Sequence, residues 1–385
     1  MASIKLKHSG GNGVIIAAPT SNPASDKTLT LPSDVDGTVV SKDSSNSLQN
    51  IAGINGGQLG NRNLVINGAM QVAQRGTSST SSGYGSIDRI NQQFGGTDEA
   101  PTFAQVDVAS GTTPYTNGFR KALRITNGNQ TSGAGASDHI YAQTILEAQD
   151  IANSGWNYTS SSSYITISYW VKSSVAQNFF GLITSSDGTA QAYVWETGSL
   201  SADTWTKITK TIPGNSNLVF NNDNGAGMYI APIRAFDGTD RTGSMSLNAW
   251  AAYSGSARTP DQTSTWYTTN DATLEITGMQ LEVGSTATDF EHMSFTDQLL
   301  RCQRYYWRMP FASESSIFVY GGAYGSGSGF VNYALPVKMR ATPTFTYTDV
   351  RTTSGLSLYN SEYQMSVQMA AENAYVKNPK LDAEL

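Results

Sequence analysis

Apolar and polar residues alternate over short stretches of this chain, which is the pattern of strands with one buried face. In residues 164–171, four apolar side chains would share one face: Ile165, Ile167, Tyr169 and Val171. In residues 274–283 the apolar set changes phase: Leu274 and Ile276, then Met279, Leu281 and Val283. Gly278 lies at the change, where a one-residue bulge would keep both sets on one face. The second stretch therefore predicts a curved strand of a sandwich or barrel.

Turn-forming dipeptides recur between such stretches. Asn-Gly begins at residues 12, 55, 67, 117, 127 and 224, and Asp-Gly begins at residues 36, 187 and 237. Both dipeptides tolerate positive φ and suit the type I′ turns that join antiparallel strands. Nine of them in one chain predict many short strands.

The composition supports a β fold. Only 14% of the residues are charged, against about 25% in a typical soluble domain. Helical surfaces normally carry Glu, Lys and Arg, because long unbranched side chains lose little rotamer freedom there. Here Ser, Thr, Asn, Gln and Gly supply the polar surface instead, and Ser, Thr, Asn and Gly favour turns and strands. We therefore expect an all-β protein.

One stretch predicts a helix, over residues 294–304. Ser294 with Asp297 three residues later resembles a capping box, with Asp in place of the usual Glu or Gln. An apolar stripe of helical period follows: Phe295, Leu299, Cys302 and Tyr306. Cys302 lies on this stripe, so a packed thiol is favoured over a reactive one.

Charge, cysteine count and hydropathy exclude several functions. The net charge is −6, and no basic cluster of the kind that neutralises phosphates is present. A single cysteine excludes a disulfide framework and a zinc site of the CxxC kind. No run approaches the roughly 18 apolar residues of a membrane span, and the amino terminus has no apolar signal region. We expect a soluble protein that binds no nucleic acid and does not insert into membranes.

The chain divides into four regions. Residues 1–60 have no aromatic residue and too few large side chains to bury a core alone, so we expect other copies or a partner protein to complete them. A disordered tail is the alternative. Residues 61–292 carry the strongest strand patterns, residues 293–310 form a helical connector, and residues 311–385 become β again, with a Gly- and Ser-rich stretch at 321–329.

Recognisable catalytic motifs are absent from the sequence. The three histidines, His8, His139 and His292, lie apart from metal-binding spacings, and there is no nucleophile elbow, P-loop or dinucleotide fingerprint. An acidic pair for glycoside hydrolysis cannot be located from sequence. The oxygen-rich run 221–225 could hold calcium, but it lacks EF-hand spacing and is better interpreted as a tight turn. We predict no enzyme, no cofactor and no metal.

Aromatic residues are the remaining functional signal. Trp170 and Trp205 lie in or before strand patterns, which predicts core positions for both. A polar, turn-rich stretch carries four more rings: Trp250, Tyr253, Trp266 and Tyr267. Flat rings flanked by Asn, Gln and Asp suit saccharides, because the rings stack on apolar sugar faces while amides bind hydroxyls. Burial under a loop or at a subunit interface is the alternative, and Tyr320 and Tyr324 beside the 321–329 stretch are the next candidates.

Several segments in order resemble a domain of phage tail fibres. They are NLVINGAMQVAQRG (63–76), IDR (87–89), ITISYWVKSS (165–174), ADTWTK (202–207), ITGMQLEVG (276–284), FEH (290–292), CQRYY (302–306), LPVKMRATP (335–343) and DAEL (382–385). Residues 1–60 are similar to short β modules at the amino ends of phage structural proteins. The resemblance implies a jelly-roll domain akin to carbohydrate-binding modules, on a homotrimeric virion fibre that touches the host surface.

These observations favour a virion fibre, assembled in the host cytoplasm, that adheres to host surface polysaccharide or lipopolysaccharide. Residues 1–60 would dock on a phage tail or capsid protein. In a trimer, three copies of the predicted helix could pack Phe295, Leu299, Cys302 and Tyr306 together. One alternative is a capsid fibre or tail spacer without a receptor role. A polysaccharide depolymerase is the other, and the coil repeats of its usual β-helix are not found in the sequence.

Overall fold

The computed structural model describes residues 3–7, 13–17, 41–42, 48–49, 61–239, 245–256, 258–309, 317–321, 329–347, 349–351, 357–369 and 374–385. The chain divides into two units, Met1–Ala52 and Gly53–Leu385. In the first unit, β1 (Ser3–Lys7) pairs antiparallel with β2 (Gly13–Ala17), and β3 (Ser41–Lys42) pairs antiparallel with β4 (Leu48–Gln49). In the first of these strands, Ile4 and Leu6 alternate with Lys5 and Lys7.

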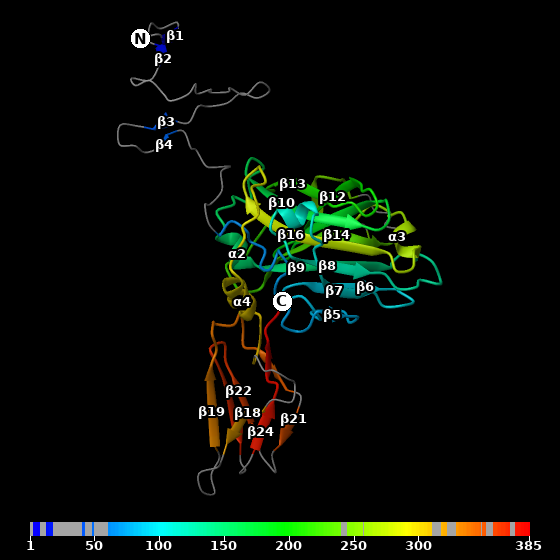
Figure 1. Cartoon of the computed structure of the whole chain (residues 1–385), viewed down its shortest axis with the longest axis vertical. Helices are drawn as coiled ribbons and strands as arrows, with labels where there is room; N and C mark the ends of the chain where they lie inside the picture. The colour runs from blue at the N-terminus through cyan, green and yellow to red at the C-terminus, as the bar shows by residue number, and fades with distance from the viewer. Residues whose placement is uncertain are drawn as a thin grey trace. The chain divides into compact units, whose positions relative to one another are not determined.

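Two six-stranded antiparallel sheets form a sandwich in the second unit (Figure 1). The first sheet has the order β13 (Thr206–Pro213), β10 (Tyr164–Ser173), β16 (Thr273–Val283), β8 (Lys121–Thr126), β7 (Thr102–Asp107) and β5 (Ser78–Ser79). The second has the order β15 (Trp250–Ala252), β12 (Gln191–Ser199), β11 (Asn178–Ser185), β14 (Ala226–Asp237), β9 (His139–Glu147) and β6 (Asn91–Gly95). The prediction of an all-β protein with a jelly-roll-like sandwich is confirmed.

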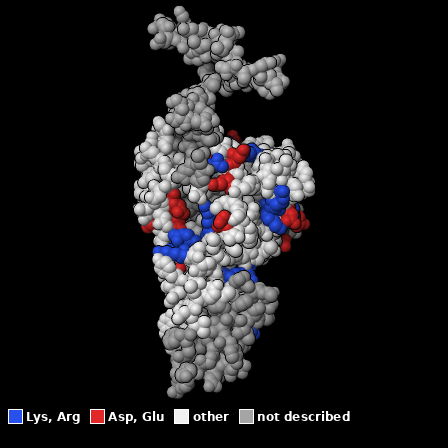
Figure 2. All heavy atoms as spheres, turned by 60° about the vertical axis from the view of Figure 1, so that its left-hand side comes forward, with Lys and Arg blue, Asp and Glu red and all other residues white. Residues whose placement is uncertain are grey.

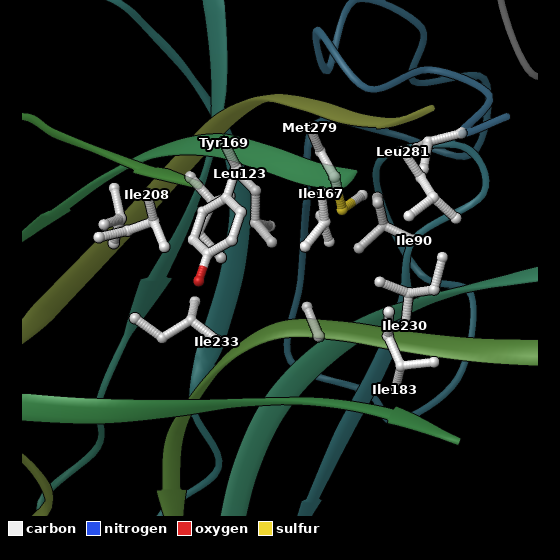
Figure 3. Close-up of a cluster of buried hydrophobic side chains, with 14 of the residues drawn as sticks. Ile90, Leu123, Ile167, Tyr169, Ile183, Ile208, Ile230, Ile233, Met279 and Leu281 are labelled. Atoms are coloured by element: carbon white, nitrogen blue, oxygen red, sulfur yellow. The ribbon is translucent and has the colours of Figure 1, made fainter. Parts of the chain in front are cut away.

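The hydrophobic core lies between these sheets. Figure 3 shows side chains of β10 and β16 pointing toward those of β11 and β14, including Ile167 and Leu281 on one side and Ile183 and Ile230 on the other. Each of these four side chains is almost fully buried. Because apolar side chains recur at every second residue along a strand, each sheet buries one face here.

The bulge predicted at Gly278 is present. Ser168 pairs with Gln280 and Trp170 with Thr277, so β16 carries one extra residue opposite β10. Gly278 has φ +64°, a conformation that glycine adopts without steric cost. The apolar residues on both sides of the bulge are buried in the same core: Leu274, Ile276, Met279 and Leu281. The predicted core positions of Trp170 and Trp205 are wrong. Both side chains are half-buried against an outer cluster and do not belong to this core.

Short helices connect the strands: α1 (Thr113–Thr116), α2 (Ala148–Ala152), α3 (Thr265–Thr268) and α4 (Phe295–Gln303). The predicted helix is α4, and its capping is as expected, since Ser294 Oγ accepts a hydrogen bond from Asp297 N at 3.1 Å. The proposed packing stripe needs correction. Cys302 and Tyr306 are buried inside their own chain, and Tyr306 already belongs to a strand, so neither is available to other copies. Phe295 is 56% exposed, and Leu299 is half-buried.

The described residues after α4 form three three-stranded sheets. Their orders are β17 (Tyr306–Arg308), β25 (Lys380–Asp382), β20 (Thr344–Thr346); β18 (Ile317–Gly321), β24 (Ala374–Lys377), β21 (Asp349–Arg351); and β19 (Gly329–Ala334), β23 (Gln364–Met369), β22 (Ser357–Asn360). The expected return to β structure is therefore present. None of the described helices is long and apolar enough to cross a membrane.

Buried ion pairs join the end of the chain to the sandwich. Glu384 pairs with Arg89 and, at 3.2 Å, with Arg75. Glu147 pairs with Arg304 at 2.7 Å and accepts a hydrogen bond from the Tyr305 hydroxyl at 2.6 Å. Since Glu147 is the last residue of β9, its contacts hold the end of α4 against the second sheet. The Glu384 pairs hold the carboxyl terminus against Arg75 and Arg89.

Candidate functional site

The chain offers few charges for recognition, since only 14% of its residues are charged. On the face in Figure 2, small groups of acidic and basic residues lie side by side among uncharged residues. The described residues contain no cluster of three or more His, Cys, Asp or Glu side chains that could hold a metal ion. In the run 221–225, Asp223 Oδ1 accepts a hydrogen bond from Gly225 N at 2.9 Å, which is a local turn. Hydroxyls, amides and aromatic rings are therefore the groups to consider.

A groove of about 340 Å³ lies on the outer face of the second sheet. We call it the tyrosine groove, after three of the residues that line it: Tyr141, Tyr229 and Tyr253. Strand alternation explains their direction. Ile140 and Ala142 of β9 point into the core, so the residue between them points outward. Met228 and Ile230 of β14 bracket Tyr229 in the same way.

The strand register brings these side chains together. Tyr229 on β14 lies opposite Thr184 on β11, and Arg234 lies opposite Tyr141 on β9. A register shift occurs in β14 between Ile230 and Arg234. Pro232 lies within the shifted stretch, where an absent N–H donor is tolerated. Because of the shift, both Tyr229 and Arg234 line the groove.

Arg234 supplies positive charge at the groove. Its guanidinium carbon lies 3.4 Å from the centre of the Tyr141 ring, and its Nε pairs with Asp237 at 2.7 Å. The side chain is only 2% exposed, and its Nη2 has no hydrogen-bond partner among the described residues. Arg258 pairs with Asp237 at 2.7 Å as well. Burial opposes the charge of Arg258, but Asp237 and Tyr253 raise its pKa above the ordinary value, so it stays protonated.

The remaining lining groups suit an oxygen-rich ligand. Gln143, Thr184 and Ser186 line the groove beside the tyrosines, and none of the described lining residues is acidic. Tyr253 is 38% exposed. An aromatic ring with a polar tip offers both an apolar face and a hydrogen-bonding hydroxyl. Rings, hydroxyls, an amide and an arginine together fit the apolar faces and hydroxyls of a saccharide.

The four predicted aromatic candidates have different environments. Trp266 and Tyr267 are fully buried, which corrects the expectation that they are surface rings. Trp266 Nε1 donates to Thr273 O at 3.2 Å, and the Tyr267 ring stacks on Phe236 at 4.3 Å. Trp250 is half-buried and donates from Nε1 to Pro213 O at 2.6 Å. Tyr253 alone of these four lines the tyrosine groove.

Tyr141 and Tyr229 are not among the residues predicted from the sequence, although their strands alternate visibly. Each is a polar-tipped ring between two small or apolar core residues. Of the secondary candidates, Tyr320 belongs to β18, and its side chain is outside the described part. Tyr324 lies outside the described residues.

No protein-family model matches the chain, and no curated protein matches it. Similar solved structures include the enzymatically active domain of tailspike protein 4 of bacteriophage CBA120, with 9% identity over 57% of this chain and 21% of that chain, at a TM-score of 0.30. A putative sugar-binding protein from Bacteroides thetaiotaomicron has 10% identity, with 57% and 99% covered and a TM-score of 0.31. A tandem CBM22 domain from Paenibacillus barcinonensis has 10% identity, with 85% and 91% covered and a TM-score of 0.28.

The match to the tailspike thus spans about a fifth of that chain. At these identities and TM-scores, the likenesses determine neither a family nor a function for this chain. Its functional assignment depends on its own residues.

Proposed function

We propose that this protein is a phage virion fibre that adheres to host cell-surface glycans through the tyrosine groove. The observation that carries the proposal is the placement of Tyr141, Tyr229 and Tyr253 with Arg234 on one outer sheet face. The groove has no acidic lining residue among those described. Since glycoside hydrolysis normally uses two carboxylates, we propose binding without cleavage.

The ordered segments that resemble a phage tail-fibre domain support the virion location. In this proposal, residues 1–60 dock on a tail or capsid protein, and the fibre is a homotrimer. Phe295 and Leu300 of α4 are exposed apolar residues and suit contact with another copy. Weak glycan binding then suffices, because several tethered sites act at high effective concentration. Light scattering of the intact protein measures the oligomeric state.

The binding test uses purified intact protein and purified host surface polysaccharide. We expect Tyr229→Ala and Tyr253→Ala each to weaken binding about 10-fold or more, since truncating an aromatic binding residue costs roughly 1.5–3 kcal/mol. Tyr164→Ala is the matched control, because Tyr164 is 37% exposed and lies outside the groove. Equal affinity of all three variants and the wild type would refute the proposal.

A reducing-end assay on the same mixture separates binding from cleavage. We expect no new reducing ends after incubation. Their appearance would identify a depolymerase and contradict the proposed function.

A further inference from the structure

A second groove, of about 460 Å³, lies on the outer face of the first sheet. We call it the Trp170 groove, and its lining includes Ser168, Trp170, Lys207, Asp289, Phe290 and His292. Trp170 points away from the core because its neighbours Tyr169 and Val171 point into it. The groove and the tyrosine groove therefore lie on opposite faces of the sandwich.

Aromatic rings and two glycines shape this groove. The rings of Phe119, Phe290 and His292 pack mutually, with centroids 4.8–5.1 Å apart. A Cβ at Gly278 would lie 2.6 Å from Phe119, and a Cβ at Gly118 would lie 2.9 Å from His292. Both glycines have positive φ. The rings can therefore lie directly against the bulge in β16, and the groove is a built feature of the fold.

Three polar groups of the groove have no partner among the described residues: the Lys207 ammonium, the Asp289 carboxylate and the Trp170 indole N–H. Lys207 is exposed, lies opposite Trp170 in the strand register, and makes no ion pair in the described part of the chain. The Asp289 carboxylate is exposed and accepts no hydrogen bond from a described residue. The Trp170 indole N–H likewise has no partner among the described residues, whereas that of Trp250 donates to a backbone carbonyl.

His292 adds a ring held in place by a hydrogen bond. Its Nε2 lies 2.9 Å from Asn117 O. Because a carbonyl oxygen only accepts, Nε2 carries the proton of this hydrogen bond. In the neutral ring, Nδ1 is then left as an acceptor. The groove thus combines a half-buried indole with hydrogen-bond donors and acceptors.

We propose that the Trp170 groove is a second saccharide-binding site, which takes a neutral sugar. The indole provides a stacking surface, and the lining carries one positive and one negative side chain, Lys207 and Asp289, so it has no net charge that would favour a charged ligand. The two grooves would allow one sandwich to bind two glycan segments at once. The Trp170 groove shares no lining residue with the tyrosine groove.

Isothermal titration of intact protein with host surface polysaccharide, and separately with neutral hexasaccharides of glucose and mannose, tests the site. We expect Trp170→Ala to remove one of two classes of polysaccharide site and to weaken neutral-hexasaccharide binding at least 10-fold. Trp205→Ala is the matched control, since Trp205 is half-buried in the same outer cluster but does not line the groove. Lys207→Ala changes only an exposed side chain and should also weaken hexasaccharide binding. This variant tests the site if Trp170→Ala fails to fold.

Two results would overturn the inference. One is that Trp170→Ala, Lys207→Ala and Trp205→Ala all bind as tightly as the wild type. The other is a lower molar mass of Trp170→Ala on light scattering, which would identify the groove as a contact between copies of the chain. Loss of binding in Trp170→Ala together with unchanged binding in Tyr229→Ala would uphold this site and refute the proposed function of the tyrosine groove. The reverse pattern, with unchanged binding in Trp170→Ala and loss in Tyr229→Ala, is a case of the first result and would refute this site alone.

Discussion

Replacing Glu384 with Gln removes a carboxylate that neutralises a fully buried arginine. Arg89 is 1% exposed and Glu384 is 5% exposed. Apart from this pair, Arg89 donates to Ile145 O, and its guanidinium carbon lies 3.5 Å from the centre of the Tyr305 ring. Neither of these contacts supplies a compensating negative charge. The variant therefore leaves a buried cation without its counter-ion.

The expected loss follows from this burial. Breaking a buried ion pair by removing one partner costs about 3–5 kcal/mol, because an uncompensated charge remains inside. The amide of Gln can still accept a hydrogen bond, so we expect about 3 kcal/mol, at the lower end of that range. Asp382 provides the comparison, since it pairs with Arg75 at 2.9 Å but is 41% exposed. Asp382→Asn should cost only about 0–1 kcal/mol, as other exposed pairs do.

Urea unfolding of the intact protein at pH 7, followed by circular dichroism, measures both losses. We expect the midpoint to fall in Glu384→Gln while the slope stays unchanged. A loss below about 1 kcal/mol in Glu384→Gln, or an equal loss in Asp382→Asn, would refute the reasoning that burial decides the cost.

Two further predictions concern the sandwich. Gly278→Ala should lower the free energy of unfolding by more than the roughly 1–2 kcal/mol that a positive φ costs a non-glycine residue, because the new Cβ also meets Phe119. Gly155→Ala is the control, since its Cβ meets open space at φ +84° and should cost only the backbone strain. Equal losses of the two variants on urea unfolding would contradict this prediction. Burial raises the pKa of Asp88 from 3.8 to about 6, so its stabilising contribution is complete below about pH 4 and is lost as the pH rises through 6. Relative to Asp88→Asn, the wild type should lose about 3 kcal/mol of unfolding free energy between pH 3 and pH 8, at about 1.4 kcal/mol per pH unit of difference in pKa. A difference that does not change with pH would be evidence against it.

Features fixed by neighbouring residues were predictable from the sequence. The Gly278 bulge follows from a phase change within ten residues, and the start of α4 follows from Ser294 and Asp297. Strand alternation also implied that the Trp170 side chain points away from the core. Its position in a strongly apolar strand nevertheless led to the prediction of a core residue. Its half-buried position depends on Phe119 and Phe290, which come from distant segments.

The candidate site depended on long-range register and could not be assembled from sequence. Tyr141 and Tyr229 are 88 positions apart, and the groove exists because β9 and β14 are adjacent with a shift at Arg234. The error at Trp266 has a related cause. Its surrounding residues are polar, but the indole finds its acceptor in the backbone of Thr273 on β16 and is buried there.

The central claim is that the tyrosine groove holds host glycan, and a structure of the intact protein with an oligosaccharide from the host surface tests it most directly. We predict sugar rings in contact with Tyr141, Tyr229 and Tyr253, with hydroxyl or carboxyl oxygens near Arg234. An oligosaccharide bound at saturating concentration only outside this groove, with the tyrosine groove empty, would contradict the claim.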